Sequence, residues 1–157
     1  GYAAAVLAAG WGLVMLRWAG GAGVILWLLL VVIASDVLGY FAGRALGGPL
    51  FWPRISPRKT WSGTAAGWVG AMAVGAGFAV TGAGGWGLLW LSPLVALAGQ
   101  LGDIAESWVK RRAGVKDSSA LIPGHGGLLD RADGLIAAVP VAAALSLALG
   151  AGVVLWR

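Results

Sequence analysis

Cysteine is absent from the chain, and charged residues make up only 11% of its 157 residues. Without cysteine the chain forms neither disulfides nor thiolate metal sites. Soluble globular domains average about 25% charged residues, so this composition excludes an ordinary soluble domain. Acidic residues are scarce, with six Asp and Glu against eleven Lys and Arg, and histidine occurs once. The few polar side chains that could take part in chemistry are therefore easy to locate.

Apolar residues dominate what is present: 59% of the chain is hydrophobic, with 28 glycines and ten tryptophans. Long apolar runs are typical of polytopic membrane proteins. Small residues such as glycine let helix backbones approach closely in lipid, and tryptophan is enriched at membrane interfaces. The sequence therefore predicts an all-α, polytopic integral membrane protein.

Five apolar segments are predicted to cross the membrane, since a spanning helix needs about 20 mostly apolar residues. They comprise residues 2–16, 22–46, 63–80, 86–112 and 128–156. Residues 17–21 separate the first two, and two polar loops, 47–62 and 113–127, separate later ones. No internal repeat is evident. We therefore expect one membrane-embedded domain over residues 1–157, with about five transmembrane helices.

The two polar loops share one side of the membrane, because two predicted spans separate them. Together with neighbouring helix ends they hold nine of the eleven basic residues: Arg44, Arg54, Arg58, Lys59, Lys110, Arg111, Arg112, Lys116 and Arg131. The positive-inside rule places such loops in the cytoplasm, so a polar site there would face the cytoplasm, in a bacterial inner (plasma) membrane. Basic loops between apolar segments indicate anionic lipid and phosphate partners rather than nucleic acid.

Polar residues concentrate between residues 103 and 133, which contain five of the six acidic residues and the only histidine. Asp103 and Asp130 fall near predicted helix ends. A carboxylate at membrane depth costs about 2.5–3.5 kcal/mol on insertion scales, so each needs a partner. A divalent cation with oxygen ligands suits two facing carboxylates, and salt bridges to Arg111 or Arg131 are an equal alternative. Asp133 lies three residues beyond Asp130, on the same helical face.

The basic run Lys110-Arg111-Arg112, with Lys116, has two interpretations. It is either a cytoplasmic stop-transfer cluster or a set of phosphate-binding side chains.

The segment Pro123-Gly-His125-Gly126-Gly127 is typical of a loop whose backbone N–H groups close on an anion. For His125 we favour contact with phosphate, or a role in organising the loop, over proton transfer.

Two further segments carry polar candidates. Ser56, Lys59 and Thr60 in the first loop are candidate nucleotide-phosphate contacts, or part of a basic interfacial loop. Asp36, Tyr40 and Arg44 share one helical face, so Asp36 either pairs with Tyr40 or Arg44 or lines a polar cavity. We expect Asp36, Tyr40 and Asp117 to line such a cavity.

Three motifs resemble the phosphatidate cytidylyltransferases, also called CDP-diacylglycerol synthases. The main one comprises Ser107, Lys110-Arg111, Lys116-Asp117, Pro123-Gly-His125-Gly126-Gly127 and Asp130-Arg131-Ala-Asp133. Residues 56–63 resemble the family's Ser-Pro-Lys-Lys-Thr-Trp-Glu-Gly, with Arg58 for lysine and Ser62 for glutamate. The second departure indicates either a divergent or less active enzyme, or a helix-cap glutamate for which serine can substitute. Residues 36–44 resemble Asp-x-x-Ala-Tyr-x-x-Gly-Arg, with Gly39 for alanine. The chain would be the C-terminal, catalytic half of such a protein.

The resemblance implies a nucleotidyltransferase that converts CTP and phosphatidate to CDP-diacylglycerol and pyrophosphate. It implies Mg²⁺, in a site of one or two cations, held by Asp103 and Asp130 with Asp133 as a further ligand or an outer partner. Catalytic residues would be Asp103, Asp130, Lys110 and Arg131. Substrate phosphates would contact Lys110, Arg111, Lys116, His125, Gly126, Gly127 and Arg131. The partners are CTP, phosphatidate and bilayer lipid, and a homodimer is left open.

Three rival hypotheses stand beside this one. A related archaeal-type synthase uses an ether-lipid phosphate, but the intact Pro-x-His-Gly-Gly and Asp-Arg-x-Asp blocks favour the diacyl-lipid family. A transporter could use Asp36, Asp103 and Asp130 as a cation pathway, but its site is expected at the midplane on broken helices. A catalytically silent membrane protein is favoured only by Ser62 in place of glutamate.

Overall fold

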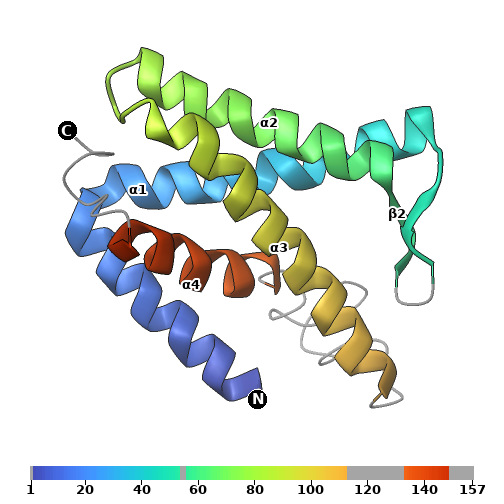
Figure 1. The fold of residues 1–157 in the computed structure, drawn as a ribbon. Helices are drawn as coiled ribbons and strands as arrows, with labels where there is room; N and C mark the ends of the chain where they lie inside the picture. The colour runs from blue at the N-terminus through green and yellow to red at the C-terminus, as the bar shows by residue number, and fades with distance from the viewer. Residues whose placement is uncertain (1, 54–55, 113–132, 149–157) are drawn as a thin grey trace, which may run out of the picture.

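Helices dominate the computed structural model, which describes residues 2–53, 56–112 and 133–148. The elements are α1 (Tyr2–Leu46), β1 (Leu50–Trp52), β2 (Ser56–Thr60), α2 (Trp61–Val80), α3 (Gly87–Arg112) and α4 (Asp133–Ala148). Figure 1 shows α2 running back along the second half of α1, with α3 starting beside the end of α2 and crossing α1. The predicted helical membrane-protein fold is confirmed.

Within the part of the chain that the structure describes, three helical stretches are long and apolar enough to cross a membrane: Ala3–Leu46, Trp61–Val80 and Gly87–Val109. A fourth apolar stretch, Gly134–Ala148, is shorter. Large apolar side chains face outward along these helices, as at Trp18 (84% exposed). A bilayer would cover such side chains, whereas water would not favour them. The expected count of five spans is not confirmed.

The break predicted at residues 17–21 is a kink at a single residue. α1 stays helical up to the kink at Gly21, whose φ of 67° and ψ of −152° are not helical. Glycine adopts a positive φ without the steric cost that a Cβ imposes. The kink divides α1 into a first arm, residues 2–20, and a second arm, residues 22–46, which diverge in Figure 1. The first two predicted spans therefore correspond to two arms of one long helix.

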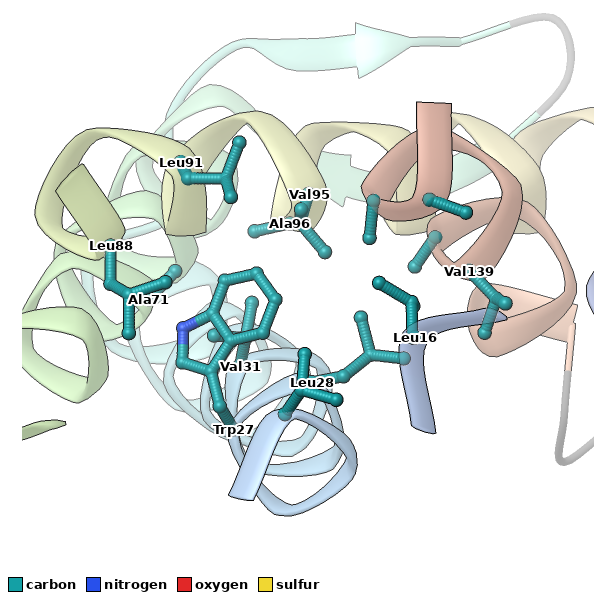
Figure 2. Packing of buried hydrophobic residues seen from close by; sticks show 14 of the residues in the cluster. Leu16, Trp27, Leu28, Val31, Ala71, Leu88, Leu91, Val95, Ala96 and Val139 are labelled. Carbon is teal, nitrogen blue, oxygen red and sulfur yellow. The ribbon is translucent and has the colours of Figure 1, made fainter. Parts of the chain in front are cut away.

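The apolar core lies where the four helices meet. Figure 2 shows Trp27 and Val31 of α1 among Ala71 of α2 and Leu88 of α3, all buried. The Trp27 Nε1–H donates to the Ser92 hydroxyl over 2.9 Å, and this hydroxyl donates to the Leu88 carbonyl. These bonds satisfy the polar atoms that the core contains at this point.

Glycines let α1 and α2 pack at backbone contact distance. A Cβ on Gly63 would lie 2.5 Å from the Gly39 carbonyl oxygen and 3.3 Å from the Gly43 Cα. Further along α2, a Cβ on Gly67 would lie 2.9 Å from the Ser35 carbonyl oxygen. This is the small-residue packing that the glycine content predicts.

Replacing Gly63 with alanine is expected to destabilise the α1–α2 interface, because the new methyl group meets a backbone carbonyl that cannot rotate away. Overpacking of this kind costs about 1–3 kcal/mol. Gly77 is the matched control, since it lies in the same helix and a Cβ added to it would have no atom within 4 Å. Thermal unfolding in detergent should show a lower midpoint for Gly63→Ala and an equal or higher one for Gly77→Ala. A midpoint for Gly63→Ala equal to that of the wild type would contradict the close contact between α1 and α2.

The first polar loop contains a short antiparallel hairpin that the sequence did not predict. Leu50 pairs with Thr60 and Trp52 pairs with Ser56. The centroids of the Phe51 and Trp61 rings lie 4.6 Å apart, so the hairpin packs against the start of α2. α2 also begins earlier than expected, at Trp61 instead of residue 63.

α4 packs between the first arm of α1 and α3. A Cβ on Gly12 would meet Val139 of α4, and one on Gly99 would lie 3.3 Å from the Gly134 carbonyl oxygen. The fifth predicted span, 128–156, is described for residues 133–148 only, and its remainder lies outside the described residues, as does the second polar loop.

Candidate active site

A cavity of about 600 Å³ opens between the second arm of α1, strand β2 and the adjoining parts of α2 and α3. It is lined by Ser35, Asp36, Gly39, Tyr40, Gly43, Arg44, Lys59, Thr60, Gly63, Thr64 and Gln100. This volume lies in the range of small-molecule sites. Every lining residue is either polar or glycine, although the surrounding helices are apolar.

The wall formed by α1 carries Asp36, Tyr40 and Arg44, spaced four residues apart and therefore on one face. The Arg44 Nη1–H donates to the Tyr40 hydroxyl over 3.0 Å. Arg44 and Tyr40 are therefore linked across one turn of α1. Asp36 and Tyr40, expected to line a polar cavity, both lie in this wall.

Lys59 joins two of the predicted site residues. Its Nζ lies 2.8 Å from Asp103 Oδ2 and donates a second bond, over 3.0 Å, to the Gln100 carbonyl oxygen. The Lys59 and Asp103 side chains are 30% and 21% exposed. The lysine predicted to contact nucleotide phosphate therefore forms an ion pair with the aspartate predicted to bind a cation.

Thr60, not Ser62, caps α2. The Gly63 backbone N–H donates to the Thr60 hydroxyl, and the Ser62 hydroxyl donates to the Gly47 carbonyl oxygen over 2.5 Å. Of the two alternatives for Ser62, the helix cap is therefore not observed, since Thr60 already fills the N-cap position. Of the three nucleotide candidates, Lys59 and Thr60 line the cavity, while Ser56 lies at the start of β2 and does not.

Gln100 is a site residue that the sequence analysis missed. Its Oε1 accepts from Trp68 Nε1 over 3.1 Å, and its Nε2 donates to the Ser35 hydroxyl over 3.0 Å. These bonds connect α1, α2 and α3 at the cavity wall. The available signal was a polar side chain one turn before Asp103 in an otherwise apolar stretch.

Asp103 also lies beside the start of α4. Its Oδ1 is 3.1 Å from the position that a Cβ on Gly134 would occupy, so it faces the helix that begins at Asp133. Asp103 is part-exposed, and carboxylate oxygens are the ligands that a hard divalent cation prefers. Among the side chains that the structure describes, no three His, Cys, Asp or Glu residues form a metal-binding group.

The second polar loop and the start of the fifth predicted span lie outside the described residues. This applies to Lys116, Asp117, His125, Gly126, Gly127, Asp130 and Arg131, and to the side chains of Lys110 and Asp133. Arg111 is exposed at the end of α3. The Arg112 guanidinium lies 4.3 Å from the centroid of the Trp108 ring, which accounts for its position without a substrate.

The model of the cytidylyltransferase family matches residues 2–149. A phosphatidate cytidylyltransferase from Brucella abortus is 54% identical over 116 residues, which cover 73% of this chain and 43% of the relative. The one from Pseudomonas aeruginosa is 40% identical over 150 residues, which cover 90% of this chain and 54% of the relative. The chain thus spans about half the length of these relatives.

A solved structure of an intramembrane enzyme for archaeal membrane lipids biosynthesis has a similar fold. It matches with a TM-score of 0.53 and 26% identity, over 79% of this chain and 85% of that one. The family model covers nearly the whole chain, and its match agrees with the motifs around the cavity. The chain belongs to the cytidylyltransferase family.

Proposed function

We propose that the protein transfers a cytidylyl group from CTP to phosphatidate. A phosphate oxygen of phosphatidate attacks the α-phosphorus of CTP, a new P–O–P bond forms, and the bond to the β-phosphate breaks. The products are CDP-diacylglycerol and pyrophosphate. Residues 1–157 act as a single membrane-embedded catalytic domain in this proposal.

The observation that carries the proposal is the position of Lys59 in the wall of the cavity. Within the described residues, two of its three N–H donors go to Asp103 and to the Gln100 carbonyl oxygen, which leaves the third for a ligand. An ammonium held in this way offers a preorganised positive charge to a phosphate group. Arg44 of α1, which also lines the cavity, adds a second positive charge.

A divalent cation, Mg²⁺ in our proposal, would be held by Asp103 and Asp130, with Asp133 in support. When bound, such a cation stabilises charge that develops on phosphate oxygens. Asp103 holds Lys59 as well, so this one carboxylate positions two positive charges at the site. Lys110, Arg111, Lys116 and Arg131 would contact the pyrophosphate that leaves, and the segment around His125 would contact a substrate phosphate.

The setting in the membrane suits the two substrates. Apolar side chains that face outward surround the cavity, as at Phe41 (63% exposed), so a lipid phosphate can reach it from the bilayer. The clustering of basic residues near the cavity end of the bundle supports a site that faces the cytoplasm, where CTP is available.

Incubating the complete, purified protein with phosphatidate and labelled CTP, with and without Mg²⁺, tests the proposal. We expect a labelled CDP-lipid and one pyrophosphate for each lipid formed. Pyrophosphate release that is independent of phosphatidate, or the absence of a CDP-lipid, would refute the assignment.

An ether-lipid phosphate is the second candidate acceptor, because the archaeal membrane-lipid enzyme has a similar fold. The higher identity, 54%, is to a protein named for phosphatidate, which favours the diacyl lipid. Supplying both acceptors in the same assay ranks them directly. Family membership argues against the transporter hypothesis.

A further inference from the structure

Gln100 contacts other elements of the fold through both its side chain and its backbone. Its carbonyl oxygen accepts from the Lys59 Nζ over 3.0 Å, and Asp103, three residues further along α3, holds the same ammonium group over 2.8 Å. The position of this ammonium group therefore depends on where α3 lies relative to strand β2, which carries Lys59. Since a backbone carbonyl moves only with its helix, a shift of α3 at this turn would shift Lys59 as well.

The Gln100 side chain fixes α3 at the same turn. Trp68 Nε1 of α2 can only donate, so the amide oxygen accepts from it, over 3.1 Å, and the amide NH₂ donates to the Ser35 hydroxyl of α1, over 3.0 Å. One amide thus ties α3 to both neighbouring helices. A hydrogen-bonded network inside an apolar bundle rigidifies it and favours one arrangement of the helices.

Gly67 of α2 leaves the space that these bonds need. A Cβ at this position would lie 2.6 Å from Gln100 Nε2 and 2.8 Å from the Ser35 hydroxyl oxygen. Gly67 and Trp68 are consecutive, so one turn of α2 supplies both the gap for the amide and the donor to its oxygen. The backbone of α2 therefore confines the amide sterically, in addition to its hydrogen bonds.

The contacts with Lys59 and the contacts with the two neighbouring helices meet in this one residue. We infer that Gln100 is a positioning residue, which places the Lys59 ammonium group in the cavity by fixing α3 against α1 and α2. Trp68 does not line the cavity, so it acts on Lys59 through Gln100. The inference rests on the proposed function, since it gives the positioned ammonium group a substrate phosphate to bind.

Substitutions at three positions disrupt the network and leave Lys59 in place. Gln100→Met keeps the approximate length of the side chain and removes both of its hydrogen bonds, while the backbone carbonyl stays. Trp68→Phe and Ser35→Ala each remove one partner of the amide. Turnover of the complete protein should fall roughly ten- to one-hundredfold in Gln100→Met and roughly three- to tenfold in the other two, because a misplacement of about 1 Å at a reacting centre costs up to about a hundredfold.

The same substitutions in a Lys59→Met background separate positioning from a general loss of stability. Where Gln100 acts through Lys59, Gln100→Met should change the residual turnover of Lys59→Met by less than about twofold, and Trp68→Phe should add as little to Gln100→Met. A loss of folded protein would lower turnover by the same factor in both backgrounds. Trp68→Phe carries the test where Gln100→Met lowers the folding yield.

The chemical reactivity of the Lys59 amine gives a readout that does not depend on turnover. Acetylation by an amine-reactive ester, followed by mass spectrometry of the peptide that contains Lys59, should be faster in Gln100→Met and Trp68→Phe than in the wild type, because the ammonium group is held less firmly. Ser92→Ala is the matched control, since its hydroxyl also links α1 to α3, through Trp27, and does not line the cavity. This control should keep the wild-type turnover and the wild-type reactivity of Lys59.

An equal loss of turnover from Gln100→Met with and without Lys59 would overturn the inference, as would wild-type reactivity of the Lys59 amine in both network variants. Failure of the proposed function gives a different result. In that case the wild-type protein forms no CDP-lipid from CTP and phosphatidate, while acetylation still reports whether Gln100 places the Lys59 amine.

Discussion

Turnover is expected to fall by about a thousandfold or more when Asp103 is replaced by asparagine. Asparagine keeps the size of the side chain and an oxygen that can accept from Lys59, but it removes the negative charge. That charge holds the Lys59 ammonium at 2.8 Å, and in our proposal it also holds a divalent cation. One substitution therefore weakens both positive charges that would stabilise the reacting phosphates.

The measurement is turnover as a function of Mg²⁺ concentration, made separately for the variants Asp103→Asn and Asp130→Asn. Helix content and thermal midpoint close to wild type would establish that the variants insert and fold. Near-normal turnover with an unchanged Mg²⁺ requirement in either variant would remove that residue from the cation site.

Lys59→Met should reduce turnover by roughly a hundred- to a thousandfold, the effect of removing one preorganised donor from a reacting centre. Methionine keeps much of the length of lysine but offers no donor to a phosphate and no charge to Asp103. The turnover of Lys59→Arg is expected to lie between those of the wild type and Lys59→Met, because a planar guanidinium keeps the charge but not the geometry of the ammonium.

Arg112→Met is the matched control for the lysine variant. The two substitutions remove the same charge, but the Arg112 guanidinium lies over the Trp108 ring and not in the cavity. Its turnover should stay within a few-fold of wild type. If Arg112→Met proves as damaging as Lys59→Met, the basic residues act through topology or net charge, and not through contact with substrate.

The helices could be predicted from sequence because their signal is local. Apolar runs long enough to span a bilayer mark α2 and α3, and glycine at position 21 allows the kink within the predicted break. The hairpin was missed because β2, Ser-Pro-Arg-Lys-Thr, contains proline and lacks the alternation typical of a strand. Its formation depends on contacts such as that between Phe51 and Trp61.

The site was predictable as a set of residues but not as a set of contacts. Asp36, Lys59 and Asp103 stand out as polar residues in an apolar chain. The pairing of Lys59 with Asp103, 44 residues away, requires the packing of α3 against the start of α2. The role of Gln100 depends on Ser35, which is 65 residues away, and on the absence of a side chain at Gly67. No sequence periodicity encodes such contacts.

Occupancy of the cavity by CTP can be measured by chemical protection. The chain contains no cysteine, so a thiol introduced at Tyr40, which lines the cavity and is 59% exposed, can be modified selectively in a protein without other cysteines. Ala45→Cys is the control, since Ala45 is exposed in the same helix but does not line the cavity. CTP with Mg²⁺ should slow modification of Tyr40→Cys by a charged thiol reagent and leave Ala45→Cys unaffected. Equal modification rates for Tyr40→Cys with and without CTP, under conditions in which the protein forms CDP-lipid, would contradict a nucleotide site in this cavity.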